Sequence, residues 1–152
     1  MHDYRLIVST GQSFSDADSA LRHIGEKLVS EGICRESYPA ALLEREATYP
    51  TGIALDGHAV AIPHSEAQHA IEPAIYLIRP DSPVAFSQAD DDGFVQAELI
   101  IALVVTHPEQ QLNLLRALFS QLQQPDFIES LLSVPEEGMS DCFNNRLFSP
   151  AA

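Results

Sequence analysis

An uninterrupted apolar stretch, Leu99–Val105, most constrains what this chain can fold into. A strand with one wet face alternates apolar and polar residues, whereas a strand that is apolar at every position must be covered on both faces. We therefore expect a strand over Val95–Val105, whose later part forms the centre of a sheet with helices on both sides. The stretch is far too short to cross a bilayer, so we expect no direct membrane insertion.

Patterns on either side of this stretch complete an α/β arrangement. Ser15 or Asp16 is expected to cap a first helix, with apolar residues at helical spacing up to Gly32. Further helices are predicted over 37–47, 109–122 and 125–132, and short strands over 59–62, 74–78 and 84–86. The segment from Pro50 to Gly57 is predicted to be irregular and rich in turns. The result is a single domain over residues 1–152, a sandwich in which a mixed β-sheet is covered by helices on both faces.

The charge balance excludes some classes of partner. Acidic residues outnumber basic residues 22 to 8, which gives a formal net charge of −14. Nucleic acids and anionic membrane surfaces are bound by clustered Lys and Arg, so neither is an expected partner. The acidity favours a partner with a basic docking face, although solubility alone also accounts for it. Two distant cysteines without a CxxC motif, and a beginning unlike a signal peptide, predict a cytoplasmic protein with reduced thiols.

The segment Val60–His64 carries the most informative chemistry. Pro63 lacks an N–H and cannot continue a β-ladder, so the strand is expected to end there and to present His64 to solvent. A neutral imidazole nitrogen is a good nucleophile near neutral pH, and it can accept a phosphoryl group and pass it on. An isolated Pro-His pair is more often an ordinary loop feature, so the hypothesis depends on the surrounding residues.

Taken together, these residues resemble the IIA components of the fructose–mannitol class of the bacterial sugar phosphotransferase system. In that family a hydrophobic–Ala–hydrophobic–Pro–His run ends at the phosphorylated histidine, and here it reads Val60-Ala61-Ile62-Pro63-His64. The family's Arg-Glu pair before a Thr-Gly turn corresponds to Arg45-Glu46 and Thr51-Gly52. The resemblance covers nearly the full chain. Similarity to the galactitol-specific members of the class is carried by Arg45–Ala47, Tyr49–Ile53, Gln88–Asp92 and Gln121–Asp126.

The resemblance implies a phosphotransferase that carries a phosphoryl group on His64. Arg45 would neutralise the phosphoryl oxygens, and Gln111 stands where many members have a second histidine, with His107 four residues earlier. The donor would be the phosphocarrier protein HPr, and the acceptor a cysteine of a IIB subunit of the same permease, for uptake of a polyol such as galactitol. No metal or organic cofactor is implied, and no phosphate-binding glycine motif suggests a nucleotide.

Two other functions stay open, as does one feature of the site. A regulatory phosphoprotein of the nitrogen-type IIA family would be phosphorylated in the same way without serving a permease. A metal-binding or hydrolytic domain would use His58, His64 and His69, although their spacing matches no zinc motif. The group that orients the imidazole of His64 is Glu66, Glu98 or a backbone carbonyl, since each would fix its tautomer.

Overall fold

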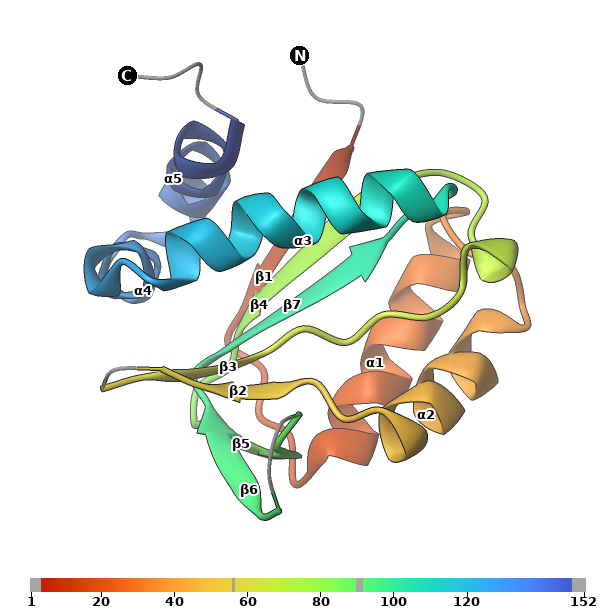
Figure 1. Cartoon of the computed structure of the whole chain (residues 1–152), viewed down its shortest axis with the longest axis horizontal. Coiled ribbons are helices and arrows are strands. Elements are labelled where there is room, and N and C mark those ends of the chain that lie inside the picture. Colours follow the sequence, from red (N-terminus) through yellow and green to blue (C-terminus); the bar gives the residue numbers. More distant parts are fainter. Residues whose placement is uncertain (1–3, 56, 90–91, 149–152) are drawn as a thin grey trace.

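The computed structural model of the chain describes residues 4–55, 57–89 and 92–148, so Asp90 and Asp91 of the stretch Gln88–Asp92 lie outside the described residues. Within them, a five-stranded mixed sheet has the strand order β1-β4-β7-β3-β2 (Figure 1). Parallel pairs are β1 with β4 and β3 with β7, and antiparallel pairs are β4 with β7 and β2 with β3. The strands are β1 (Arg5–Thr10), β2 (Gly52–Ala54), β3 (Ala59–Ala61), β4 (Ala74–Arg79) and β7 (Leu99–Val104), and a separate antiparallel hairpin holds β5 (Val84–Ser87) and β6 (Phe94–Ala97).

Helices cover both faces of this sheet (Figure 1). On one face lie α1 (Ala17–Ser30) and α2 (Tyr38–Thr48), and on the other lie α3 (Pro108–Leu122), α4 (Pro125–Ser133) and α5 (Glu136–Phe148). Successive residues of a strand point to opposite faces, so Ile100 and Ala102 of β7 pack towards α1 and α2. Ile101 and Leu103 pack towards α3, α4 and α5. The predicted fold, a mixed sheet covered by helices on both faces, is confirmed.

The prediction of one continuous strand over Val95–Val105 is wrong. The segment divides at Glu98 into β6, which pairs with β5, and β7, which pairs with β4 and β3. Burial alternates along β6, as in a strand with one exposed face, while every residue of β7 is buried. The backbone N–H of Glu98 donates to the carbonyl of Ala59 at 2.9 Å, so the chain leaves the hairpin at the one acidic residue of the segment.

The sequence-based prediction lacks β1, β2, α5 and the short 3-10 helix η1 (Ala67–His69). Within the described residues β1 is an edge strand paired with β4, and β2 lies in the segment expected to be irregular. α5 has a weak apolar stripe. Of its residues 136–147, the ones that are fully buried are Met139 and Phe143, which lie one turn apart. Of the two expected caps of the first helix, Ser15 and Asp16, the structure has Asp16, whose carboxylate accepts the N–H of Ser19 at 2.8 Å. None of the described helices combines the length and apolar character that a bilayer crossing requires.

Gly52 permits the close approach of β2 to the β5–β6 hairpin, so a larger residue at this position is expected to lower the stability of the protein. A Cβ at this position would lie 2.5 Å from the carbonyl oxygen of Ser87 and 2.8 Å from Cγ2 of Val95. We expect Gly52→Ala to lower the free energy of unfolding by about 1–3 kcal/mol, measured by urea denaturation, because neither strand can move without repacking.

Gly138 in α5 provides the matched control for this substitution. A Cβ there meets nothing closer than Cβ of Val134 at 3.7 Å, which is an ordinary contact. Gly138→Ala is expected to leave stability unchanged or to raise it by up to about 1 kcal/mol, through helix propensity. Equal stability of Gly52→Ala and the unmodified protein would show that the two strands do not approach as closely as described.

Candidate functional site

His64 lies just beyond β3, beside the buried end of β7. The carbonyl of Pro63 accepts the N–H of Leu103 at 3.0 Å, and His64 itself forms a β-bridge with Leu103. The regular strand ends at Ala61, as expected for a strand that runs into a proline. His64 therefore lies at a strand end, as predicted. Its side chain is half-buried, so the ring is only partly open to solvent.

A backbone carbonyl orients the imidazole of His64. Nδ1 lies 2.8 Å from the carbonyl oxygen of Ile62. A carbonyl oxygen only accepts, so Nδ1 carries the proton and Nε2 keeps a free lone pair. The two carboxylates considered as alternatives are engaged elsewhere: Glu66 accepts from Arg45 at 3.0 Å, and Glu98 binds His58 at 2.8 Å.

The ring of His64 borders a small cavity of about 160 Å³ with a mostly apolar lining. The wall comes from the segment around β2, from the chain after β5 and from one face of α3. Phe119 of α3 is 39 % exposed, so an apolar side chain reaches the surface next to this cavity. The remaining lining residues are Pro50, Thr51, Ile53, Ile62, Ala89 and Leu115.

This environment lowers the pKa of His64 below its ordinary value of 6.5. Burial is the main cause, since it disfavours the charged imidazolium, and the positive charge of Arg45 acts in the same direction. The hydrogen bond to the Ile62 carbonyl and the charge of Glu66 oppose the shift. At neutral pH the ring is therefore neutral, as a nucleophilic nitrogen requires.

Arg45 is placed next to the His64 segment by α2. It lies in the last turn of that helix, and its guanidinium donates to Glu66, two residues after His64, at 3.0 Å. The guanidinium also lies over the ring of Tyr49, with 4.8 Å between Cζ and the ring centroid. A delocalised, permanently charged group in this position can reach phosphoryl oxygens by exchanging its carboxylate partner. The structure thus brings Arg45 and His64 into one region.

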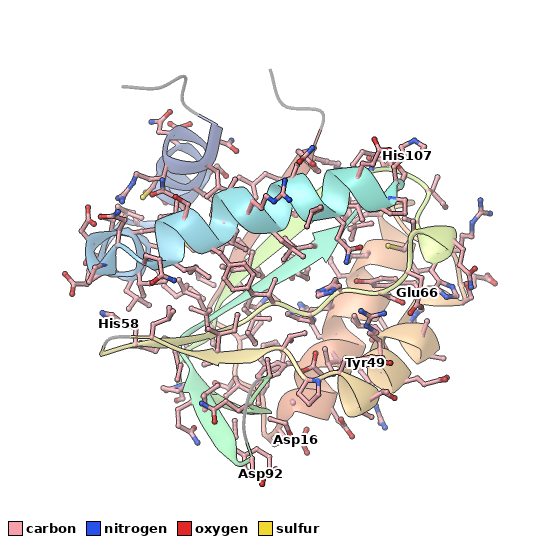
Figure 2. All side chains as sticks on the ribbon, viewed as in Figure 1. Asp16, Tyr49, His58, Glu66, Asp92 and His107 are labelled. Carbon is pink, nitrogen blue, oxygen red and sulfur yellow. The ribbon has the colours of Figure 1, made fainter. Side chains whose placement is uncertain are left out.

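Gln111 and His107 occupy the first turn of α3, which follows the end of β7. His107 is the exposed N-cap residue, and its carbonyl accepts the N–H of Gln111 at 3.3 Å. Gln111 is half-buried and lies one turn before Leu115, which lines the His64 cavity. Figure 2 shows His107 and Glu66 on the same side of the molecule. Among the described residues, no hydrogen bond joins Gln111 or His107 to His64.

The other two histidines of the metal-site hypothesis lie apart and have partners of their own. His58 binds Glu98 at 2.8 Å and Glu129 at 3.4 Å, on the side of the view opposite to Glu66 (Figure 2). His69 binds the hydroxyl of Ser37 through Nδ1 at 2.8 Å. In the ranges that the structure describes, no group of three His, Cys, Asp or Glu residues is arranged to hold a metal ion.

One buried carboxylate next to this site was not singled out as a candidate from the sequence. Glu46 is 8 % exposed, and it accepts hydrogen bonds from both the N–H and the hydroxyl of Thr51, at 2.8 and 2.7 Å. Its spacing was a usable signal, because a residue one turn after the apolar Leu42 faces the same buried side of the helix. In the sequence, Glu46 stands out only as part of the Arg45-Glu46 pair.

An NMR titration of the imidazole resonances tests the electrostatics of this site. We expect His64 to titrate below 6.5, and Arg45→Ala to move its midpoint upward because a repelling charge is removed. His58 is an internal reference: its hydrogen bond to Glu98 raises its pKa above 6.5. His64 titrating at or above the ordinary value would contradict the buried, neutral ring.

Residues 3–139 match the family described as "Phosphoenolpyruvate-dependent sugar phosphotransferase system, EIIA 2". The chain is 51 % identical, over 138 residues, to the galactitol-specific EIIA component of the phosphotransferase system of Escherichia coli (strain K12). This alignment covers 91 % of the chain and 92 % of the relative.

Solved structures show the same fold at lower sequence identity. The crystal structure of IIA mannitol from Escherichia coli superposes with a TM-score of 0.70 at 23 % identity, covering 92 % of this chain and 94 % of that one. An NMR structure of the complex between enzyme IIAMTL and phosphorylated enzyme IIBMTL, also from Escherichia coli, matches with a TM-score of 0.70 at 21 % identity. The match covers 94 % of each chain.

Proposed function

Since the chain belongs to the EIIA 2 family of the phosphoenolpyruvate-dependent sugar phosphotransferase system, we propose that Nε2 of His64 carries a phosphoryl group between two partner proteins. The observation that carries this proposal is the hydrogen bond from Nδ1 of His64 to the carbonyl of Ile62. It leaves Nε2 unprotonated on a neutral ring, which is the state in which an imidazole attacks phosphorus.

In the first step the donor is the phosphohistidine of the phosphocarrier protein HPr. The lone pair of His64 Nε2 attacks phosphorus, a new N–P bond forms, and the N–P bond of the donor breaks in line with it. A donor ring in its imidazolium form leaves as neutral imidazole, so no proton has to move. His64 becomes a phosphoimidazolium, whose Nδ1–H stays on the carbonyl of Ile62.

In the second step the acceptor is the thiolate of a cysteine on a IIB subunit. The sulfur attacks phosphorus, an S–P bond forms and the N–P bond breaks, which returns His64 to its neutral form with the proton still on Nδ1. The apolar surface at Phe119 and the half-buried ring suit partners that dock in turn through small, transient interfaces.

Charge on the phosphoryl group is balanced by residues around His64. Arg45 supplies a guanidinium from α2. It is paired with Glu66 until the phosphoryl group competes for the same N–H donors. The amide of Gln111 is a hydrogen-bond donor on the cavity side of α3, and His107 is an exposed imidazole at the same helix end. In this proposal, Gln111 or His107 takes the place of the second histidine that many members of the family have.

The identity to a galactitol-specific component supports uptake of galactitol as the process that this chain serves. A regulatory role without transport is less well supported, because the chain is 51 % identical to a transport component. The two functions differ in whether the phosphoryl group leaves His64 for a IIB subunit of a permease.

Reconstitution with phosphoenolpyruvate, enzyme I and HPr tests the carrier function. We expect one acid-labile phosphate per chain, and we expect His64→Ala to abolish it because the accepting nitrogen is removed. His69→Ala is the matched control and should be phosphorylated like the unmodified protein. Phosphate on His107, or none on the unmodified protein, would overturn the proposal.

Removal of the guanidinium tests the role of Arg45. Arg45→Ala is expected to slow phosphoryl transfer by about tenfold or more, since one preorganised cation at the developing charge is lost. Unfolding measurements should show a loss of at most about 1 kcal/mol, because the ion pair with Glu66 is largely exposed. A transfer rate equal to that of the unmodified protein would remove Arg45 from the mechanism.

A further inference from the structure

We infer that Glu46 is a positioning residue for the phosphoryl-accepting imidazole, acting through Thr51 and Ile62. This inference rests on the proposed function of His64 and adds a residue that does not touch the phosphoryl group. It follows from a continuous series of hydrogen bonds that joins the buried carboxylate of Glu46 to Nδ1 of His64.

Glu46 lies where a carboxylate is unfavourable. It belongs to the last turn of α2, and the C-terminal end of a helix favours positive rather than negative charge. It is also 8 % exposed, and taking a carboxylate out of water costs free energy unless hydrogen bonds replace the lost solvent. An apolar side chain would fill this space without that cost, so packing alone does not account for the residue.

Both carboxylate oxygens of Glu46 accept hydrogen bonds from the same residue, Thr51. Oε2 accepts the backbone N–H of Thr51 at 2.8 Å, and Oε1 accepts its hydroxyl at 2.7 Å. Hydrogen bonds to an ionised acceptor are stronger than neutral ones, and two of them to one residue fix its orientation as well as its position. Thr51 is thereby held at the beginning of β2 from both its backbone and its side chain.

Thr51 in turn holds Ile62. The carbonyl of Thr51 accepts the N–H of Ile62 at 3.2 Å, which extends the β2–β3 ladder by one further pair. The carbonyl of the same Ile62 accepts Nδ1–H of His64 at 2.8 Å. Thr51 and Ile62 also form part of the cavity wall beside the imidazole, so their positions set both its hydrogen bond and its packing.

The consequence concerns which nitrogen of His64 is free to react. A neutral imidazole without a fixed acceptor exchanges between two tautomers, and the tautomer with a proton on Nε2 has no lone pair on that nitrogen with which to attack phosphorus. Displacement of the Ile62 carbonyl by a few tenths of an ångström weakens the bond that selects the Nδ1–H tautomer. Glu46 therefore maintains the reactive tautomer and the ring orientation from the far end of the series.

The test compares Glu46→Ala with Glu46→Gln. Imidazole ¹⁵N shifts should show a single Nδ1–H tautomer of His64 in the unmodified protein and a mixture of both tautomers in Glu46→Ala. The saturating rate of phosphoryl acceptance from phosphorylated HPr should fall by about tenfold, with KM changed less than about twofold, because positioning rather than docking is lost. Glu46→Gln keeps an acceptor for the Thr51 N–H. It should therefore show the single Nδ1–H tautomer and a saturating rate within about threefold of the unmodified protein.

Controls separate positioning from general damage. Glu44→Ala removes an exposed carboxylate from the same helix and should leave the tautomer and the rate unchanged. If Glu46→Ala does not fold, Thr51→Val removes one of the two bonds while keeping the shape, and Thr51→Ser keeps both. Thr51→Val should then show the tautomer mixture and Thr51→Ser should not.

The inference would be overturned if folded Glu46→Ala showed a single Nδ1–H tautomer of His64 and accepted phosphate at the rate of the unmodified protein. If Glu46→Ala does not fold, the same result in Thr51→Val would overturn it. Failure of the proposed function would look different. If the proposed function is wrong, the unmodified protein itself does not accept phosphate on His64, while the ¹⁵N shifts still report whether Glu46 controls the tautomer of the ring.

Discussion

The hydrogen bond between Nδ1 of His64 and the carbonyl of Ile62 determines what the rest of the site can do. It works because the segment is held from both sides: the N–H of Ile62 bonds to Thr51 of the β2 segment, and the carbonyl of Pro63 bonds to Leu103 of β7. Pro63 has no N–H, so the chain can end its ladder there without leaving a donor unpaired. The ring is consequently fixed by backbone groups, which do not change protonation state.

Burial and charge act on the same ring in a coordinated way. The apolar cavity lowers the pKa of His64, and its neutral form therefore dominates at neutral pH. The nearby charge of Arg45 favours the neutral ring before transfer and favours the anionic phosphoryl group after it. Glu66 keeps this guanidinium paired in the resting protein, and the exchange of a carboxylate for a phosphoryl group involves similar geometry.

The sequence predicts those features that depend on local order. The cap at Ser15 or Asp16, the helices α1 to α4 and the strand before Pro63 follow from short-range patterns. The motif ending at His64 points to this residue as the proposed nucleophile, by resemblance. Features set by pairing between elements were missed or wrong: β2 pairs with β3 and approaches the β5–β6 hairpin at Gly52, and Glu98 divides β6 from β7. The groups that bind Glu46 and orient His64 are close in sequence, since Thr51 follows Glu46 by five residues and Ile62 precedes His64 by two. A backbone carbonyl was one of the expected orienting groups for His64, but the sequence did not distinguish it from Glu66 and Glu98, and it gave no sign of the Thr51 partner.

The central claim is that backbone hydrogen bonding leaves Nε2 as the reacting nitrogen of His64. NMR of the phosphorylated, ¹⁵N-labelled protein tests it directly, because a one-bond coupling between ³¹P and ¹⁵N identifies the nitrogen that carries phosphorus. The account predicts this coupling at Nε2 of His64, with Nδ1 still protonated. Coupling at Nδ1 of His64, or at a nitrogen of any other residue, would contradict it.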